Sequence, residues 1–600
     1  MDHKESVKRM KKLIPILAAL LLLTVSAARA DVIDLQILAT SDLHGKFLAW
    51  DYALDQESTK GSMAQLSTAI RELRTENSLL LDAGDTIQGN SAALFLDQEV
   101  HPMVAALNLL GYDAWTAGNH DFNYGIDALK NVIAQLDAQT VLGNVWDADG
   151  QPLAPAYTIV ERAGLRIGIV GMVTPHITKW DGPNLVGCTV TDPVRECRKA
   201  VDELKDRTDV LIALMHMGVE DELDTPDTGC RALAEACPEF DLIIASHDHE
   251  AIEGIEVNGV LIVENRDQAQ TMNEIHLTVE RDDDGCRVTG RTSRTISLAD
   301  YAPDEAFAQA LSADHDRAIE NARKEIGTLE GGDLASADEI VGIPRALTED
   351  TALIDLINDT QLRYSGARVS AAAMPSLQSA LREGTIRACD VSLIYKFENT
   401  LYMLEMSGRQ LKMYMEWSAR FFPQYHEGDL TFAYDPAVTY FNYDMFQGVC
   451  YKIDISRPVG SRIVDLTWPD GTPVAEDEVF TVAVNNYRAN SQLLTPGIIF
   501  EADDLPVLVR SDIRGDLGGI RELITDYIVN GCGGALTPVC DHNWSIIGND
   551  WDPELHAEAV RELNEGEIPL LDEHAKLGLN AKAITVEDLV RTVQTDTTSN

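Results

Sequence analysis

Short apolar runs alternate with stretches of helical periodicity over residues 33 to about 298. Between the first two runs, Met63, Leu66, Ile70 and Leu73 recur at a spacing that places them on one face of a helix. Strands and helices that alternate in this way are typical of a layered α/β domain. The strand-like runs are LQILAT, SLLLDA, RIGIVGMV, DVLIALMH and FDLIIASH.

The pattern changes after residue 300. From about Pro303 to Ile326 the chain is charged, rich in Ala and Glu and poor in large apolar residues, which predicts a solvated connecting helix. An α+β domain is predicted beyond it, with the strand-like runs TLYMLEMSG, VCYKIDIS and VFTVAVNN. The divisions predicted are a leader at 1–30, an α/β domain at 31–300, a linker helix region at 301–346, a second domain at 347–550 and a C-terminal extension at 551–600.

The first thirty residues have the pattern of a secretory signal. A basic start leads into the apolar run LIPILAALLLLTVSA and ends at Ala-Arg-Ala, residues 28–30, which is a small-x-small cleavage site. This run is shorter than the ~20 residues that a bilayer-spanning helix needs, and no second long apolar stretch follows. We therefore expect an exported protein, periplasmic or extracellular, with no stable membrane association after the signal is removed.

Acidic residues outnumber basic residues by 97 to 48, for a formal net charge of −49. Such a chain would be repelled by a nucleic-acid duplex or an anionic membrane surface, so neither is expected as a partner. The excess of acid fits a solvated surface, and a bound metal can still make the local field positive. Nothing in the pattern indicates an oligomer, and we expect a monomer.

Nine cysteines are present, and three pairs lie close in sequence. An oxidising compartment would permit local disulfides between them, although the sequence does not fix the connectivity. None of the nine lies in a CxxC metal-binding pattern. The three pairs are Cys188 with Cys197, Cys230 with Cys237, and Cys532 with Cys540.

Polar clusters stand where the apolar runs of the first domain stop. Open α/β sheets gather the ends of separate strands at one crevice, so these side chains are expected to meet there. Carboxylate, amide and imidazole ligands suit divalent zinc, manganese, cobalt or iron, and these groups are too many for one ion and about right for two. The clusters are Asp42 with His44, Asp85, Asn119 with His120, His216, and His247 with His249.

The blocks DLH, GDTIQGN, GNHDF, MHMG and SHDH, in this order, resemble the five blocks of the calcineurin-like metallophosphoesterases, in the secreted 5′-nucleotidase branch. The resemblance implies a layered αββα sandwich followed by an α+β substrate-binding domain. It also implies that a water activated by two metals attacks phosphorus, with His120 steadying the transition state. The ligands implied are Asp42, His44 and His249 for one metal, Asn119, His216 and His247 for the other, and Asp85 as the bridge.

Two positions depart from the family pattern. Asn123 stands where 5′-nucleotidases carry an aspartate paired with His120, so His120 is expected to act as a neutral hydrogen-bond donor, or only to orient Asp121 or Asn123. Ser246 replaces a glycine, which could cost backbone freedom.

The segment NHDFNYG, with Asn123, resembles a branch of periplasmic 2′,3′-cyclic-nucleotide 2′-phosphodiesterase/3′-nucleotidases. The second domain resembles the same branch and, in VSAAAMP, lacks the arginine-bearing motif with which 5′-nucleotidases grip phosphate. The resemblance implies that Phe397 and Tyr487 sandwich a base, at roughly 1–3 kcal/mol per stack. Asn486, Tyr443 and Phe441 are further candidates for substrate binding, and the alternative is that these aromatic rings are core residues.

These observations predict an exported enzyme with two divalent metal ions that converts 2′,3′-cyclic nucleotides to 3′-nucleotides and then to nucleosides. A 5′-nucleotidase or UDP-sugar diphosphatase is the nearest alternative. A secreted nucleotide-binding protein without turnover, and a structural protein with incidental ion binding, are alternatives of other classes.

Overall fold

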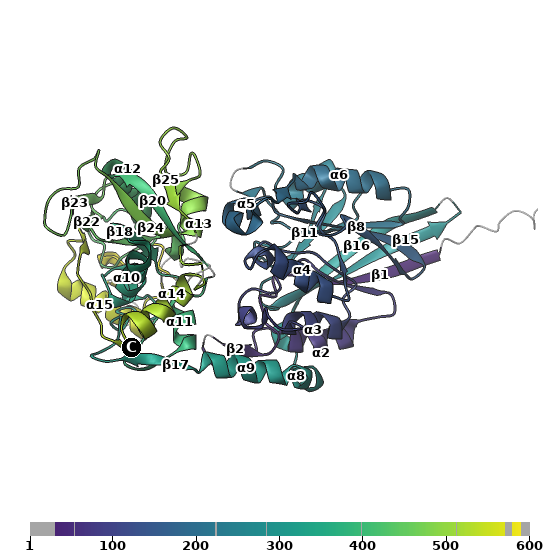
Figure 1. Cartoon of the computed structure of the whole chain (residues 1–600), viewed down its shortest axis with the longest axis horizontal. Coiled ribbons are helices and arrows are strands. Elements are labelled where there is room, and N and C mark those ends of the chain that lie inside the picture. Colours follow the sequence, from purple (N-terminus) through teal and green to yellow (C-terminus); the bar gives the residue numbers. More distant parts are fainter. Residues whose placement is uncertain are drawn as a thin grey trace, which may run out of the picture.

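The computed structural model describes residues 31–589 except 53, 223–224, 284, 398, 512, 516 and 571–578. The predicted signal at residues 1–30 lies outside the described residues. Within the part described, no helix has both the length and the apolar character that a membrane crossing requires. Figure 1 shows two domains side by side, with α8 (Glu305–Ala310) and α9 (Ser312–Ala322) running along one edge of the molecule.

The N-terminal domain contains two six-stranded sheets. Buried aliphatic side chains from both, such as Ile37, Leu81, Ile169 and Leu214, form one cluster between them. The first sheet has the order β16 (Gly285–Ser297), β15 (Thr271–Asp282), β1 (Asp31–Thr40), β4 (Ser78–Asp82), β5 (Ala114–Trp115), β6 (Gln139–Thr140). The second has the order β13 (Ile252–Val257), β14 (Val260–Glu264), β12 (Leu242–Ile244), β11 (Val210–His216), β9 (Leu165–Val173), β8 (Tyr157–Arg162).

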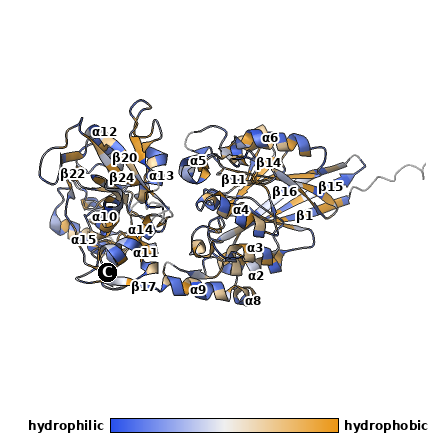
Figure 2. Cartoon of the chain, viewed as in Figure 1, coloured by the Kyte–Doolittle hydropathy of each residue, from blue (hydrophilic) through white to orange (hydrophobic). Residues whose placement is uncertain are grey.

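Helices cover the outer faces of the two sheets, which completes the predicted αββα sandwich. Figure 2 shows hydrophobic colour along the strands and hydrophilic stretches on the covering helices. The predicted helix is confirmed as α2, in which Met63, Leu66 and Ile70 are buried and Ser62 caps the first turn by accepting from Gln65 N. The helices over the two faces are α2 (Met63–Leu73), α3 (Pro102–Leu110) and α4 (Ile126–Gln135), and α6 (Pro193–Leu204) and α7 (Cys230–Ala236).

The C-terminal domain is built around a mixed five-stranded sheet. All three strand-like runs predicted there are strands. The sheet has the order β21 (Asp444–Gln447), β18 (Val369–Ala373), β24 (Val479–Asn485), β20 (Leu401–Ser407), β25 (Val507–Arg510). Two three-stranded sheets adjoin it. One has the order β23 (Ile463–Thr467), β22 (Cys450–Asp454), β27 (Trp544–Ile547), and the other has the order β19 (Gly384–Arg387), β17 (Glu325–Leu329), β26 (Ala535–Leu536). Its helices are α10 (Ala352–Ser365), α11 (Ala388–Ile394), α12 (Gly408–Ala419), α13 (Asn486–Arg488), α14 (Ile520–Asp526) and α15 (Pro553–Glu565).

The connecting segment differs from the expectation of a fully solvated helix. It forms two helices, and Phe307, Leu311 and Ala318 are buried in the hydrophobic cluster of the N-terminal domain. The few apolar residues of this charged stretch are therefore enough to fix it on that domain.

The cysteines are unpaired in the structure, so none of the three local pairs forms a disulfide. Cys197 is buried in α6 with its Sγ 4.0 Å from Met215 Sδ, whereas Cys188 is only half buried. Proximity in sequence therefore did not predict pairing.

Candidate metal and nucleotide site

The ends of strands from both sheets meet at one crevice, as the sequence predicts. β1, β4 and β5 are parallel neighbours in the first sheet, and β11 and β12 are parallel neighbours in the second. The residues at or just after their carboxyl ends are Asp42, Asp85 and Asn119 from the first sheet, and His216, His247 and His249 from the second.

The backbone at this crevice is strained. Five of the predicted ligands have backbone φ angles in the left-handed region, which residues other than glycine rarely adopt. They are Asp42 (52°), His44 (43°), Asp85 (57°), His247 (83°) and His249 (58°). Strain of this kind persists only where the surroundings enforce it, and it concentrates at functional sites.

Gly118 allows the two sheets to approach each other here. A Cβ at this position would lie 2.1 Å from Asp85 Oδ1 and 2.5 Å from His216 Cε1. Both contacts are shorter than van der Waals distance, so only glycine leaves room for the two side chains. Ser246 is not in the left-handed region, so its side chain costs no backbone freedom, and its hydroxyl donates to Met215 O at 3.0 Å.

Asp42, His44 and His249 form one compact group of donor atoms. His249 Nε2 lies 3.3 Å from His44 Nε2 and 3.4 Å from Asp42 Oδ1. One oxygen and two ring nitrogens thus converge on a single point, which fits a divalent ion with mixed oxygen and nitrogen ligands.

A second group lies beside the first. Asn119 Oδ1 is 3.0 Å from His216 Nε2 and 2.8 Å from His247 Nδ1. Asp85 Oδ2 is 3.3 Å from His216 Nε2 and 3.9 Å from His44 Nε2, and so contacts both groups. This is the position that a bridging carboxylate requires.

The carboxylate oxygens in the crevice lack enough hydrogen-bond donors from the protein, and their environment favours bound cations. Asp42 Oδ1 and Asp85 Oδ2 are buried without a hydrogen-bond partner. Burial opposes ionisation of Asp42, yet nearby His249 and His216 bring its pKa down to about 2. Burial likewise opposes protonation of His216, yet Asp85 and Asp42 raise its pKa to about 10. The buried carboxylates therefore demand positive charge at this point, which divalent ions supply.

Neighbouring acceptors orient the imidazole rings. Glu222 Oε1 lies 2.8 Å from His247 Nε2, so that ring can present Nδ1 to a metal. His216 Nδ1 donates to Ala83 O at 2.7 Å and leaves Nε2 for the crevice. Glu222 lies four residues after the MHMG block but belongs to none of the recognised motifs, so the sequence did not indicate its role.

Asn123 connects His120 to the Asp181 carboxylate, whose role the sequence did not indicate. Asn123 Nδ2 donates to Asp181 Oδ1 at 2.8 Å, and this directs its carbonyl toward His120 Nδ1 at 2.9 Å. His120 Nδ1 must then carry a proton. A neutral ring in this tautomer has no proton on Nε2, so the expected neutral donor does not fit, and donation from Nε2 requires the imidazolium.

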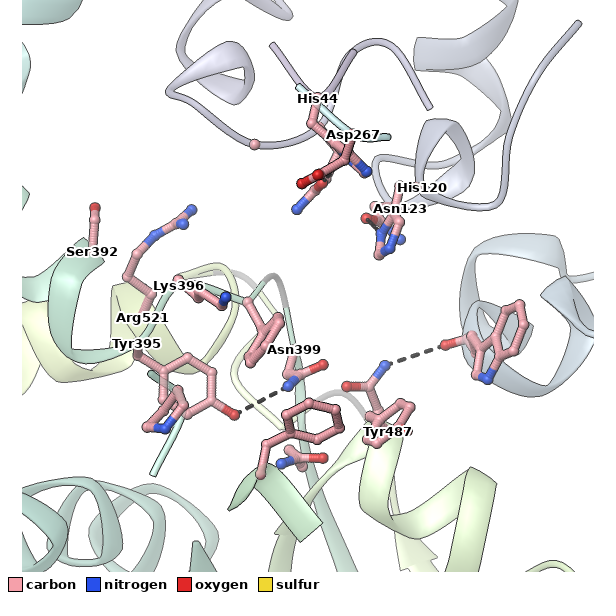
Figure 3. A pocket seen from close by; sticks show the side chains of 18 of the residues that line it. His44, His120, Asn123, Asp267, Ser392, Tyr395, Lys396, Asn399, Tyr487 and Arg521 are labelled. Atoms are coloured by element: carbon pink, nitrogen blue, oxygen red, sulfur yellow. Dashed lines mark hydrogen bonds between the residues drawn. The ribbon is translucent and has the colours of Figure 1, made fainter. Parts of the chain in front are cut away.

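A cavity of about 740 Å³ runs from this crevice into the C-terminal domain. Figure 3 shows His44, His120 and Asn123 on one side of it and Tyr395, Lys396 and Tyr487 on the other. The domains touch beside it, where Asn486 Nδ2 donates to Trp180 O at 3.2 Å. The aromatic and amide residues lining the C-terminal side include Phe397, Phe441, Tyr440, Tyr487, Asn486 and Asn399.

Tyr443 does not line this cavity, contrary to our prediction. It is 1% exposed and stacks on Phe421, with ring centroids 5.0 Å apart and planes at 15°. Tyr440–Asn442 form a single 3₁₀ turn that ends at Tyr443, and this turn places Tyr443 in the core while Phe441 faces the cavity.

Comparisons with known proteins agree with this architecture. The family model for calcineurin-like phosphoesterases matches residues 35–251, and the model for the 5′-nucleotidase C-terminal domain matches residues 326–493. A 2′,3′-cyclic-nucleotide 2′-phosphodiesterase/3′-nucleotidase from Salmonella typhimurium is 29% identical over 79% of this chain and 83% of its own length.

Two further proteins are similar over most of the chain. The trifunctional nucleotide phosphoesterase YfkN of Bacillus subtilis is 26% identical over 86% of this chain, which spans 39% of that protein. The crystal structure of a putative 5′-nucleotidase from Staphylococcus aureus superposes with a TM-score of 0.71 at 22% identity, over 86% of this chain and 100% of that one. The chain is therefore a metallophosphoesterase of the 5′-nucleotidase family, in which a calcineurin-like phosphoesterase domain precedes a 5′-nucleotidase C-terminal domain.

Proposed function

We propose that this chain is an exported hydrolase with two divalent metal ions, which opens 2′,3′-cyclic nucleotides to 3′-nucleotides and then removes the 3′-phosphate. The observation that carries the proposal is that two ligand groups share Asp85 at the edge of a cavity whose opposite wall is aromatic. The paired ligand groups suit two metal ions that promote displacement at phosphorus, and the aromatic wall suits a nucleoside base.

Each part of the cavity has a task in this proposal. Asp42, His44 and His249 would hold one ion, Asn119, His216 and His247 would hold the other, and Asp85 would contact both. Bound divalent ions would supply Lewis acidity and an activated water. When protonated, His120 can donate from Nε2 to the leaving oxygen, and Asn123 holds that ring in place. Phe397 and Tyr487 hold the base.

Two observations favour the 3′ reaction over the 5′ reaction. Several relatives that align over most of the chain carry the name 2′,3′-cyclic-nucleotide 2′-phosphodiesterase/3′-nucleotidase. Ala372, Ala373 and Pro375 line the cavity in the VSAAAMP region, where the resemblance to 5′-nucleotidases would require an arginine. Export rests on the signal-like pattern of residues 1–30.

A 5′-nucleotidase or UDP-sugar diphosphatase is the second candidate, because a 5′-nucleotidase of Vibrio cholerae is also 25% identical over 64% of the chain. Turnover of 2′,3′-cAMP, 3′-AMP, 5′-AMP and UDP-glucose by the purified, metal-loaded protein, with the products separated by chromatography, distinguishes the two. We expect the first two substrates to be preferred. Preferential turnover of 5′-AMP or UDP-glucose contradicts the proposal, and nucleotide affinity without release at any divalent metal would indicate a binding protein.

A further inference from the structure

The charges that line the cavity are divided between its two walls. Among the described lining residues, the carboxylates are Asp51, Asp181 and Asp267, and all three belong to the N-terminal domain. The lysine and arginine side chains there are Lys396 and Arg521, and both belong to the C-terminal domain. In a chain with twice as many acidic as basic residues, this separation of charge is not an effect of composition.

Lys396 and Arg521 come from packed elements. Lys396 follows α11, Arg521 lies in the first turn of α14, and these two helices contact each other. Figure 3 shows both side chains extending from the C-terminal wall into the space that faces His44 and Asp267. Arg521 Nε donates to Glu522 Oε1 at 3.0 Å, which directs the guanidinium.

Lys396 lies beside the position proposed for the base. Its Nζ is 5.0 Å from the centre of the Phe397 ring. Burial lowers the pKa of the Lys396 ammonium, and the charge of Asp267 across the cavity opposes this shift. Lys396, on the same wall of the cavity as Arg521, is thus placed to meet negative charge that the nucleotide carries away from the reacting phosphate, which His120 and the metal ligands serve.

We propose that Lys396 and Arg521 form a second anion subsite, which selects nucleotides that carry a phosphate on the 5′ oxygen in addition to the reacting 3′-phosphate. This inference rests on the proposed function. The chemistry recognised is that of a nucleoside 3′,5′-bisphosphate or of the 3′-phosphorylated end of an oligonucleotide. Arginine offers two parallel donors to such a phosphate and lysine offers a point charge.

The test compares kcat/KM for 3′-AMP, adenosine 3′,5′-bisphosphate and the dinucleotide ApAp with a terminal 3′-phosphate. The wild-type protein is expected to prefer the bisphosphate over 3′-AMP by roughly tenfold or more, as charge-assisted hydrogen bonds give. Lys396→Met and Arg521→Gln are each expected to lower this ratio, and the double variant to bring it close to one. Lys412→Met, on the exposed side of α12, removes the same charge outside the cavity and should keep the ratio.

The outcomes distinguish this inference from the function on which it rests. If the protein hydrolyses 3′-AMP without any advantage for the bisphosphate, the subsite alone is overturned. An equal loss of kcat/KM on both substrates in the variants also overturns it, because the two cations would then serve the reacting phosphate. Absence of 3′-AMP hydrolysis overturns the proposed function and the subsite together. An advantage shared by ApAp identifies oligonucleotide ends as substrates, and one restricted to the bisphosphate identifies the free nucleotide.

Discussion

Asn123 Oδ1 lies 2.9 Å from His120 Nδ1, while the amide nitrogen of the same side chain donates to Asp181 Oδ1 at 2.8 Å. A carboxylate only accepts hydrogen bonds, so Asp181 determines which end of the Asn123 amide faces the imidazole. A carboxylate is thus still connected to His120, but through the Asn123 amide rather than by a direct hydrogen bond.

Replacing Asp181 with alanine should release the Asn123 amide and let His120 take other orientations. We expect kcat for 3′-AMP to fall by roughly tenfold or more with little change in KM, because proton donation depends on position while binding does not. Steady-state kinetics at saturating metal measure both constants. Asp147→Ala, which removes a half-buried carboxylate paired with the exposed Lys130, is the control. An unchanged kcat in Asp181→Ala would show that the ring is oriented without this contact.

The convergence of the residues predicted as ligands could be anticipated from the sequence because strand ends in an α/β sandwich meet at one edge. Asp181 and Glu222 could not, because each acts through another side chain and lies in a loop without a pattern of its own. Phe307, Leu311 and Ala318 were misread because burial of so few residues in a charged segment leaves no periodic signal. Tyr443 was misread because the YFNYD segment forms a 3₁₀ turn rather than a strand, and its sequence does not reveal which of its rings meets the core.

Asp85→Ala should abolish hydrolysis of both the cyclic and the 3′-nucleotide, by roughly a thousandfold or more, because the ions contribute several kcal/mol of charge stabilisation. Bound metal, measured by elemental analysis, should fall in parallel. Asp82→Asn is a matched control three residues away: burial raises the pKa of Asp82 to about 8, so an amide resembles its neutral form. Near-normal activity in Asp85→Ala would exclude the bridging role.

Glu222→Gln should weaken metal binding without removing a ligand. The Glu222 carboxylate lies 2.8 Å from His247 Nε2, and loss of such a partner typically costs about 10–100-fold in metal affinity or activity. Competition with a fluorescent chelator measures the affinity directly and does not depend on turnover. Glu220→Gln, at an exposed ion pair with Arg231, is the neighbouring control. Equal affinities for the wild type and Glu222→Gln would mean that His247 is oriented by other contacts.

Phe397→Ala and Tyr487→Ala should raise KM for nucleotides and spare a small ester such as bis-p-nitrophenyl phosphate. Loss of one stacked ring costs about 1–3 kcal/mol, or roughly 5-fold to 150-fold in KM. Tyr487 is 36% exposed, so its removal leaves no cavity in the core. Val507→Ala, on the exposed strand β25, is the control because this side chain packs against little. Trp417→Ala is unsuitable as a control because the Trp417 ring packs on Arg488. Equal losses on both substrates would argue against stacking.

The stability of the C-terminal domain should decrease as pH rises from about 5 to above 8. Burial raises the pKa of Asp355 to about 8, with a further contribution from the Asp350 and Asp541 carboxylates. Asp359 adds another carboxylate with a raised pKa close by. Between these two pKa values the folded state keeps a proton on Asp355, whereas the unfolded state, with a pKa near 3.8, releases it. The stabilisation from Asp355 is therefore complete below pH 3.8 and is lost as pH rises through about 8.

Asp355→Asn tests this sign because an amide resembles the neutral carboxyl and can still accept from Asp541 N. The melting temperature of the wild type relative to the variant should fall by about 2–4 °C between pH 5 and pH 8.5, the change that 1 kcal/mol gives in a domain of this size. Calorimetry at both pH values measures the difference, and exposed Asp477→Asn serves as the control. If the wild type instead gained stability relative to Asp355→Asn as pH rose, Asp355 would have to be ionised in the folded domain and stabilised by a cation among these carboxylates.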